Sequence, residues 1–220
     1  MNLLLIRHGH PDYTHDCLTP LGHSQAERAA DRLRDEKIDA FFSSPFGRAK
    51  ETALHSAEGR GMEITVLPFM RELSWGPKGE RDPSLTYNPW NQAELAVHEG
   101  AGLDENAPYL RDNTVWEYAS LVAAGADEWL PTLGYVREGL YYRCTRENTD
   151  TYALFAHAGS FAALFSHLLN LSFPQALHLL GIGFTGISRL SFDPAPGQLV
   201  CPRITLLNDM KHLEGESPGR

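Results

Sequence analysis

Five side chains of the sequence combine the types and spacing needed to handle a phosphoryl group. They are Arg7, His8, Arg48, Glu72 and His157. Arginine guanidinium groups present forked donors that match phosphate oxygens in a bidentate way, which a lysine cannot imitate. A neutral imidazole, with an ordinary pKa of about 6.5, can attack phosphorus without a general base. The set predicts transfer of a phosphoryl group through a covalent phosphohistidine.

We expect a separate role for each of these groups. His8 is the expected nucleophile, and His157 is expected to donate a hydrogen bond to the equatorial phosphoryl oxygens. Arg7 and Arg48 would bind the anion and stabilise charge in the transition state. Glu72 would protonate the leaving alkoxide and later accept a proton from the attacking water.

Two expected helix N-termini would add backbone N–H donors to the same anion. One helix is expected to begin after Ser44, with Ser43 and Ser44 serving mainly as turn and cap. The other is expected after Gly159-Ser160, which makes Ser160 a predicted substrate-binding residue.

The expected secondary structure explains why residues so far apart in the chain would meet. Short apolar runs separated by helical spacing predict a βαβαβ start and a mostly parallel sheet. The elements expected first are a strand at Leu3–Ile6, a helix from Thr19-Pro20, a strand at Ile38–Phe42, a helix from Ser44-Pro45 to about Ala57 and a strand at Ile64–Leu67. Because ligands of such sheets bind at the carboxyl ends of the strands, Arg7 and His8 are placed at that edge.

The second half of the chain is expected to complete the same sheet. Its expected elements are an insertion from about Gly76, a helical stretch over Leu110–Leu140 interrupted at Pro131 and Gly134, a strand at Tyr152–Ala156, helices from about Phe161 and from Pro174, and strands near Ile187–Phe192 and Leu199–Leu206. The sequence therefore predicts one α/β domain over 1–213, a three-layer α/β/α sandwich with helices on both faces of the sheet. An insertion at about 76–130 would cap the active site, and 214–220 is expected to be a disordered tail.

The ordered motifs of the chain resemble those of the histidine phosphatase superfamily, also called phosphoglycerate mutase-like. The motifs are "LIRHGHPDY", "LTPLGHSQAERAADRL", "FFSSPFGRAKETA", "MRELSWG" and "LFAHAGSF". The resemblance implies a phosphohistidine at His8, with Arg7, Arg48 and His157 in the phosphate pocket. It also implies Glu72 as the proton donor.

Some positions depart from the pattern of that family. His10-Pro11 follows the Arg-His-Gly triplet where Glu-Thr or Gln-Thr is common, and Thr14 stands where an Asn often assists the phosphate. Thr14 is thus a predicted substrate-binding residue by resemblance alone. Glu80 competes with Glu72 for the role of proton donor.

A metal site is the alternative interpretation of the first histidines. His8, His10 and Asp12 form an H-x-H-x-D run, to which His15 and Asp16 could add ligands. Two permanent positive charges beside a divalent cation argue against this alternative. We therefore expect no metal and no cofactor, and we expect His10, His15 and Asp16 to lie at the pocket rim or in a solvated loop.

Three further alternatives concern the reaction. A serine hydrolase triad of Ser160 and His157 lacks the Gly-x-Ser-x-Gly elbow. A phosphate-binding module without turnover would lack the nucleophile or an arginine, and this chain has both. A phosphoglycerate mutase-type phosphotransferase would need extra basic residues, whereas between Gly76 and Leu130 the chain has only Lys78, Arg81 and Arg111. We favour a metal-independent phosphomonoester hydrolase.

Composition limits the partners and the compartment. The net charge of -9 disfavours nucleic acid, so a small phosphorylated substrate is the expected partner. The start "MNLLLI" has no basic n-region, and no segment approaches the roughly 20 apolar residues of a membrane helix. The three cysteines fit neither a disulfide framework nor a metal knuckle, which predicts reduced thiols and a cytoplasmic protein. The oligomeric state stays open.

Overall fold

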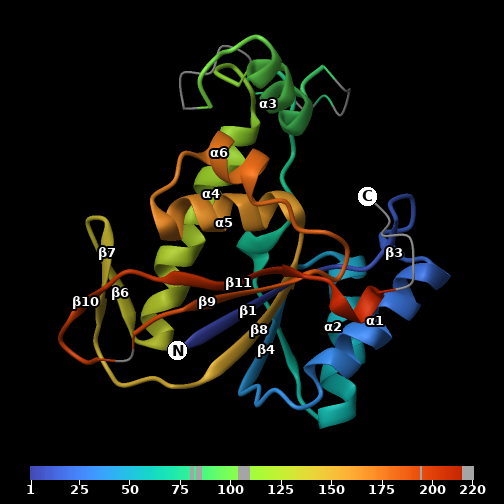
Figure 1. Cartoon of the computed structure of the whole chain (residues 1–220), viewed down its shortest axis with the longest axis vertical. Coiled ribbons are helices and arrows are strands. Elements are labelled where there is room, and N and C mark those ends of the chain that lie inside the picture. Colours follow the sequence, from blue (N-terminus) through green and yellow to red (C-terminus); the bar gives the residue numbers. More distant parts are fainter. Residues whose placement is uncertain (80–81, 83–85, 104–109, 194, 215–220) are drawn as a thin grey trace.

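The computed structural model describes residues 1–79, 82, 86–103, 110–193 and 195–214, and its centre is a six-stranded sheet (Figure 1). In order across the sheet the strands are β11 (Arg203–Asp209), β9 (Ile187–Ser191), β1 (Asn2–Arg7), β8 (Thr151–Ala156), β4 (Ala40–Ser43) and β5 (Ile64–Val66). The four strands from β1 to β5 are parallel to one another. Only β9 runs antiparallel to its two neighbours. The mostly parallel sheet predicted from the sequence is confirmed.

Strand β1 is buried on both of its faces, as its continuous apolar run predicts. Leu3 and Leu5 pack into the larger core cluster, whereas Leu4 and Ile6 pack into the smaller one on the opposite face. All four side chains are fully buried. Because side chains alternate between the two faces of a strand, β1 packs against both cores. The two cores therefore hold the strand and its carboxyl end in place.

Helices cover both faces of the sheet (Figure 1). The main helices are α1 (Pro20–Leu33), α2 (Gly47–Ala57), α3 (Pro89–His98), α4 (Val115–Trp129), α5 (Ala158–Leu169) and α6 (Phe173–Leu179). Side chains of α1 and α2 pack in the smaller core, and side chains of α4 and α5 pack in the larger one. Helix α1 begins as predicted, because Thr19 caps it by accepting a hydrogen bond from the Gly22 N–H at 3.1 Å and Pro20 is its first residue.

Helix α3 and the described parts of the chain around it project from the sheet as a cap (Figure 1). The rings of Trp75 and Trp90 meet there edge to face, with centroids 5.8 Å apart. Helix α4 connects the cap to the sheet, where Trp129 packs against Phe42 at 5.1 Å. Helix α4 also contributes side chains to the larger core. The single domain over 1–213 and the capping insertion at about 76–130 stay predictions.

The helical stretch expected up to Leu140 was wrong beyond α4. A 3-10 turn, η3 (Leu130–Leu133), follows α4, and a hairpin of β6 (Tyr135–Glu138) and β7 (Tyr141–Cys144) comes next. Gly134 with φ of 94° ends the helical segment, and Gly139 with φ of 60° makes the hairpin turn. The hairpin forms a second sheet with β10 (Leu199–Val200).

Two helices begin at other residues than expected. Helix α2 begins at Gly47 rather than at Ser44-Pro45, and α5 begins at Ala158 with His157 as its N-cap rather than near Phe161. The Ser44 hydroxyl lies before the N-cap residue Phe46, accepts from the Phe46 N–H at 3.3 Å and bonds to His157 Nε2.

Short elements complete the described chain. They are β2 (Pro11–Asp12) paired with β3 (Cys17–Leu18), η1 (Glu58–Arg60), η2 (Pro68–Met70) and η4 (Lys211–Leu213). Glu80, Arg81 and 215–220 of the expected tail lie outside the described residues. In the part of the chain that is described, no helix is both long and apolar enough to cross a bilayer.

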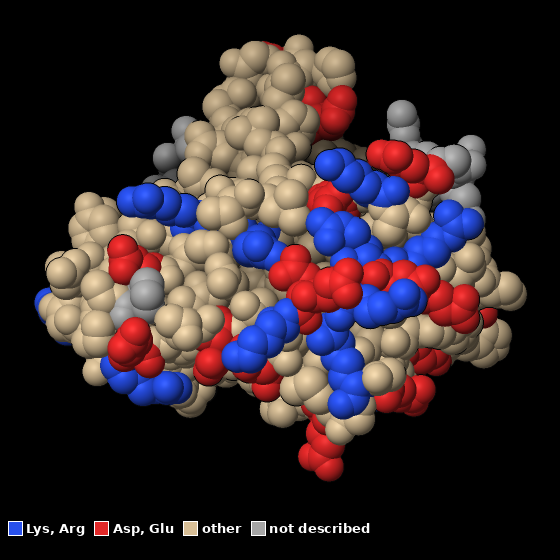
Figure 2. All heavy atoms as spheres, turned by 60° about the horizontal axis from the view of Figure 1, so that its bottom comes forward, with Lys and Arg blue, Asp and Glu red and all other residues tan. Residues whose placement is uncertain are grey.

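The face shown in Figure 2 carries Lys and Arg interleaved with Asp and Glu over the body of the molecule, while the projecting cap is mainly uncharged. Positive charge is therefore not gathered into one broad patch on this face.

Candidate active site

His8 stands at the carboxyl end of β1 and is 1% exposed. Its Nδ1 lies 2.7 Å from the Gly9 carbonyl oxygen, which can only accept, so Nδ1 carries the proton and Nε2 holds a lone pair. Arg48 Nε donates to His8 Nε2 at 3.4 Å. Burial, together with the charges of Arg7 and Arg48, lowers the pKa of His8 to about 3. The imidazole is therefore neutral at physiological pH, with its lone pair directed toward a cation.

His157 follows β8, the strand next to β1, and is fully buried. The ring centroids of His8 and His157 are 5.1 Å apart. The Ser44 hydroxyl lies 2.7 Å from His157 Nε2, and His157 Nδ1 has no hydrogen-bond partner among the described residues. Burial first, and then the neighbouring cations, hold the pKa of His157 well below its usual value. Both predicted histidines thus lie side by side as neutral rings.

Arg7 is held by the loop before β9. Its Nη1 donates to the Ile182 carbonyl at 2.7 Å, and its guanidinium lies 4.1 Å from the centroid of the Phe184 ring. Arg7 Nε is buried and has no hydrogen-bond partner in the described part of the chain. Burial lowers the pKa of Arg7, while Glu72 and a hydrogen bond with Tyr13 raise it.

Arg48 comes from the first turn of α2 and is 6% exposed. Besides its contact with His8, its Nη1 donates to Asp16 Oδ1 at 2.5 Å. The ring of Phe46 lies 4.8 Å from the guanidinium and the ring of Tyr13 lies 5.3 Å from it. Arg48 thus reaches His8 from α2, as the carboxyl-end placement predicted.

Glu72 follows η2 and meets the N-terminus of α5. Its Oε1 accepts from the Leu73 N–H at 2.9 Å, and the Ser160 backbone N–H also bonds to this carboxyl. A Cβ on Gly159 would lie only 2.6 Å from Glu72 Oε1, so a larger residue there would displace the carboxyl group. Burial raises the pKa of Glu72, and these N–H donors with Arg7 and Arg48 oppose the rise. A carboxyl group with a raised pKa beside two arginines can carry a proton.

The loop after His8 packs tightly on α1. A Cβ on Gly9 would lie 2.5 Å from the Gly22 carbonyl oxygen, and the Gly9 N–H donates to Thr52 Oγ1 at 3.0 Å. The His10 N–H donates to Gln25 Oε1 at 2.8 Å. The backbone that follows His8 is therefore fixed by α1 and α2 together.

Two predicted substrate-binding residues lie differently from the buried groups. Thr14 is exposed in the loop between β2 and β3, where its N–H donates to Asp12 Oδ1 at 2.9 Å. The hydroxyl of Ser160 is fully buried and bonds to the backbone of His157 at 3.3 Å. A contact of either side chain with a substrate stays a prediction, and Ser160 has a clearer role in capping α5.

The residues of the metal and triad alternatives do not come together. His10 Nδ1 lies 3.0 Å from Thr19 Oγ1, and His15 Nδ1 lies 2.7 Å from Asp12 Oδ2 on the exposed loop. Within the described ranges no group of three or more His, Cys, Asp or Glu side chains is arranged to hold a metal ion. Ser160 reaches the backbone of His157 and not its ring, so the triad is not assembled.

Sequence reasoning missed several side chains that surround these groups. Tyr13, Phe46 and Phe184 place aromatic rings against the two arginines and histidines. The sequence predicts mainly a capping role for Ser44, and for Asp16 a place at the rim or in a loop or, in the metal alternative, a ligand, but neither observed contact. A signal for Ser44 was present, because it ends β4 just as His157 ends the adjacent β8.

The chain is similar in sequence to proteins of one known family. Residues 3–105 match the model of the histidine phosphatase superfamily (branch 1). The resemblance to the histidine phosphatase superfamily is confirmed. The chain is 35% identical over 83 residues to "Putative phosphoserine phosphatase 2" of Hydrogenobacter thermophilus, which covers 34% of this chain and 41% of that protein. It is 30% identical over 129 residues to "Probable phosphoglycerate mutase GpmB" of Photorhabdus laumondii, which covers 50% of this chain and 60% of that protein.

Solved structures of histidine phosphatases share the fold over nearly the whole chain. Phosphoserine phosphatase of Entamoeba histolytica, in complex with 3-phosphoglyceric acid, has a TM-score of 0.64 at 21% identity, covering 96% of this chain and 98% of that one. Mycobacterial glucosyl-3-phosphoglycerate phosphatase has a TM-score of 0.63 at 24% identity, covering 94% and 98%. The three-layer α/β fold is thus confirmed. The matches to the two curated relatives above span about two-fifths to three-fifths of the length of those relatives.

Proposed function

We propose that the protein is a phosphomonoester hydrolase that works through a covalent phosphohistidine at His8. The observation that carries the proposal is the set of buried nitrogen atoms on Arg7, Arg48 and His157, the groups gathered with His8 at the carboxyl ends of the strands. Arg7 Nε and His157 Nδ1 are buried without a hydrogen-bond partner among the described residues, and Arg48 Nε faces His8 Nε2. Buried polar groups of this kind are costly unless a ligand satisfies them, and a phosphoryl group supplies several acceptor oxygens at once.

The two chemical steps follow from this arrangement. His8 Nε2 attacks phosphorus and the P–O bond to the alcohol breaks, while protonated Glu72 gives its proton to the leaving oxygen. Water then attacks the phosphohistidine, Glu72 accepts the water proton, and the P–N bond breaks to release inorganic phosphate. Arg7, Arg48 and His157 stabilise the charge on the equatorial oxygens in both steps. By donating to Nε2, Ser44 would keep the proton of His157 on Nδ1.

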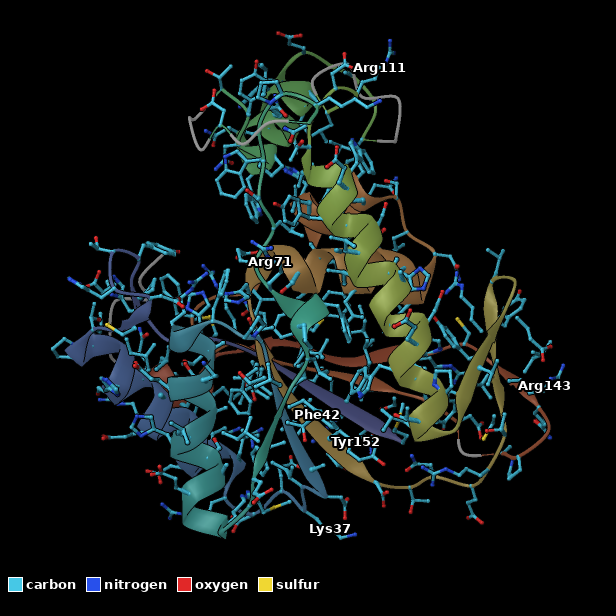
Figure 3. All side chains as sticks on the ribbon, turned by 180° about the vertical axis from the view of Figure 1, so that it is seen from behind. Lys37, Phe42, Arg71, Arg111, Arg143 and Tyr152 are labelled. Carbon is cyan, nitrogen blue, oxygen red and sulfur yellow. The ribbon has the colours of Figure 1, made fainter. Side chains whose placement is uncertain are left out.

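The cap favours a hydrolase over a mutase. A mutase must hold a second phosphate on its substrate, which calls for cations close to the nucleophile. Lys78 and Arg111 instead line a separate pocket of about 300 Å³ in the cap. Figure 3 shows Arg111 in the cap far from the sheet and Arg71 nearer to it. The relative named as a phosphoglycerate mutase keeps phosphotransfer as the second candidate.

Phosphate release from p-nitrophenyl phosphate, measured with chelator-treated protein, tests the proposal. Removing a nucleophile lowers turnover by about 10³-fold or more, so His8→Ala should be inactive. The same variant should still bind inorganic phosphate in calorimetry, because both arginines remain. Mass spectrometry should detect one added phosphoryl group in the wild type and none in the variant. Activity that persists in His8→Ala, or that requires added metal, would refute the phosphohistidine. Rapid isomerisation of 3-phosphoglycerate with little phosphate release would favour the mutase.

A further inference from the structure

The carboxylate of Asp16 accepts hydrogen bonds from two strong donors next to the proposed phosphate-binding residues. Its Oδ2 accepts from the Gly47 N–H at 2.7 Å, and its Oδ1 accepts from Arg48 Nη1 at 2.5 Å. Gly47 is the first residue of α2, and the N-cap residue Phe46 makes no side-chain capping bond. A residue from the preceding loop thus caps the helix and pairs with the arginine.

These two donors together would otherwise suit an anionic ligand. A helix N-terminus attracts anions through its backbone N–H groups and its dipole, and a guanidinium adds charge and directed donors. The two edges of Arg48 therefore face different groups. Its Nε faces the nucleophile His8 at 3.4 Å, and its Nη1 faces Asp16. The side chain of Asp16 is 42% exposed and that of Arg48 only 7%, so Asp16 is the more solvent-exposed member of the pair.

The loop holds Asp16 firmly in this place. Its backbone has φ of 51°, a left-handed conformation that Asp and Asn tolerate better than most residues. A Cβ on Gly47 would lie 2.0 Å from the Asp16 carbonyl oxygen, which shows how closely the loop approaches α2. The carboxylate is therefore held in one position beside Arg48 and does not rotate freely at the surface.

We propose that Asp16 is a specificity-determining residue that fills the position of a second anion beside the phosphoryl group. The inference rests on the proposed function and concerns the substrate class of the same site. Esters with one phosphoryl group and an uncharged alcohol part are preferred. A second carboxylate or phosphate close to the first would face the charge of Asp16, and Asp16 already occupies the Gly47 N–H and Arg48 Nη1.

A matched ligand pair tests this preference by equilibrium binding. Glycerol 3-phosphate and 3-phosphoglycerate differ by a hydroxymethyl group against a carboxylate. Calorimetry in the His8→Ala background, where turnover does not interfere, gives the ratio of their Kd values. The protein with Asp16 intact should bind glycerol 3-phosphate more tightly. Equal or tighter binding of 3-phosphoglycerate would overturn the proposal without any change at Asp16.

Asp16→Asn is the matching variant, because asparagine tolerates the left-handed backbone and still accepts from the Gly47 N–H. Its Kd ratio should shift toward 3-phosphoglycerate by about 10-fold, the size of a lost charge contact near a surface. Asp12→Asn removes an equal charge from the same loop, where Asp12 bonds to Thr14 and His15 and, among the described residues, to no arginine. It should leave the ratio nearly unchanged.

Each result has a definite meaning. An equal shift in Asp12→Asn would show a general effect of charge and overturn the proposal, as would equal weakening of both ligands in Asp16→Asn. Thermal unfolding checks that the variants are folded. These measurements need no turnover, so a protein that binds with the expected ratios but releases no phosphate would refute the hydrolase and leave the role of Asp16 standing.

Discussion

The floor of the active site and its mouth differ in burial and in what holds their side chains in place. The floor consists of His8, Arg48 and His157, which are 1%, 6% and 0% exposed. The mouth includes Tyr13, which is 68% exposed, and the exposed Arg71. The floor residues lie directly after a strand or in the first turn of a helix, whereas the mouth residues lie in loops.

This difference separates the chemistry from the choice of substrate. Strand ends fixed between two cores and the first turn of α2 hold His8, His157 and Arg48 close together, as the proposed chemistry requires. The mouth is built from aromatic and charged contacts, such as those of Arg71 with Phe46 at 5.9 Å and with Tyr118 at 5.2 Å. Loops of this kind tolerate substitution with little cost to stability, so selectivity can change while the floor is kept.

Apart from replacement of His8, the largest decrease in kcat is expected from replacing Glu72, the proposed proton donor. Glu72→Gln should lower kcat for an alkyl phosphate by about 10²-fold or more, and much less for p-nitrophenyl phosphate, whose leaving group needs little protonation. Steady-state kinetics with both esters measures the difference. Equal losses for the two esters would show that Glu72 is not the donor and would reopen the case for Glu80.

The pH dependence of kcat sharpens the same assignment. Because the pKa of Glu72 is raised, its proton is kept at mildly acidic pH and is lost as pH increases through that pKa, so kcat should fall on the alkaline side. His8, with a pKa of about 3, should cause no acid limb near pH 6.5. The alkaline limb should vanish in Glu72→Gln. Since an ester ionises near pH 6 itself, kcat and not kcat/KM is compared.

A smaller loss of activity is expected from removing the Ser44 hydroxyl, which bonds to His157. Ser44→Ala leaves both ring nitrogens of the buried His157 without a protein partner, which should cost about 1–2 kcal/mol, or roughly 10-fold in kcat/KM. Ser43→Ala is the matched control, because that buried hydroxyl bonds to the Ser44 carbonyl at 3.0 Å and not to a histidine. Similar kcat/KM values for the two variants would mean that Ser44 does not position His157.

The smallest effect is expected at the mouth. Tyr13→Phe keeps the ring near Arg48 but removes the hydroxyl that bonds to Arg7. For an exposed hydrogen bond we expect a loss of about 1 kcal/mol or less, seen as a KM increase of at most about fivefold with kcat unchanged. A large fall in kcat would contradict the separation of mouth from floor.

The fold and the floor could be predicted largely from the sequence, and the mouth could not. Apolar runs with the two-residue period of strands gave the sheet, and the carboxyl-end rule placed His8 and His157 on one edge. The hairpin of β6 and β7 was missed because Tyr135–Glu138 has no clear alternation to separate it from the helical stretch before it. The contacts of Asp16 and Phe184 depend on loops, whose path local patterns do not define.

The sequence by itself determined which chemistry the chain can support, since residue types at strand ends set the donors, the nucleophile and their common edge. Only the tertiary structure decided the protonation and pairing of these groups. Burial lowers the pKa of His8 and raises that of Glu72, and the approach of the loop to α2 pairs Asp16 with Arg48. Desolvation and close packing arise when distant segments meet, so no local pattern of residues contains them.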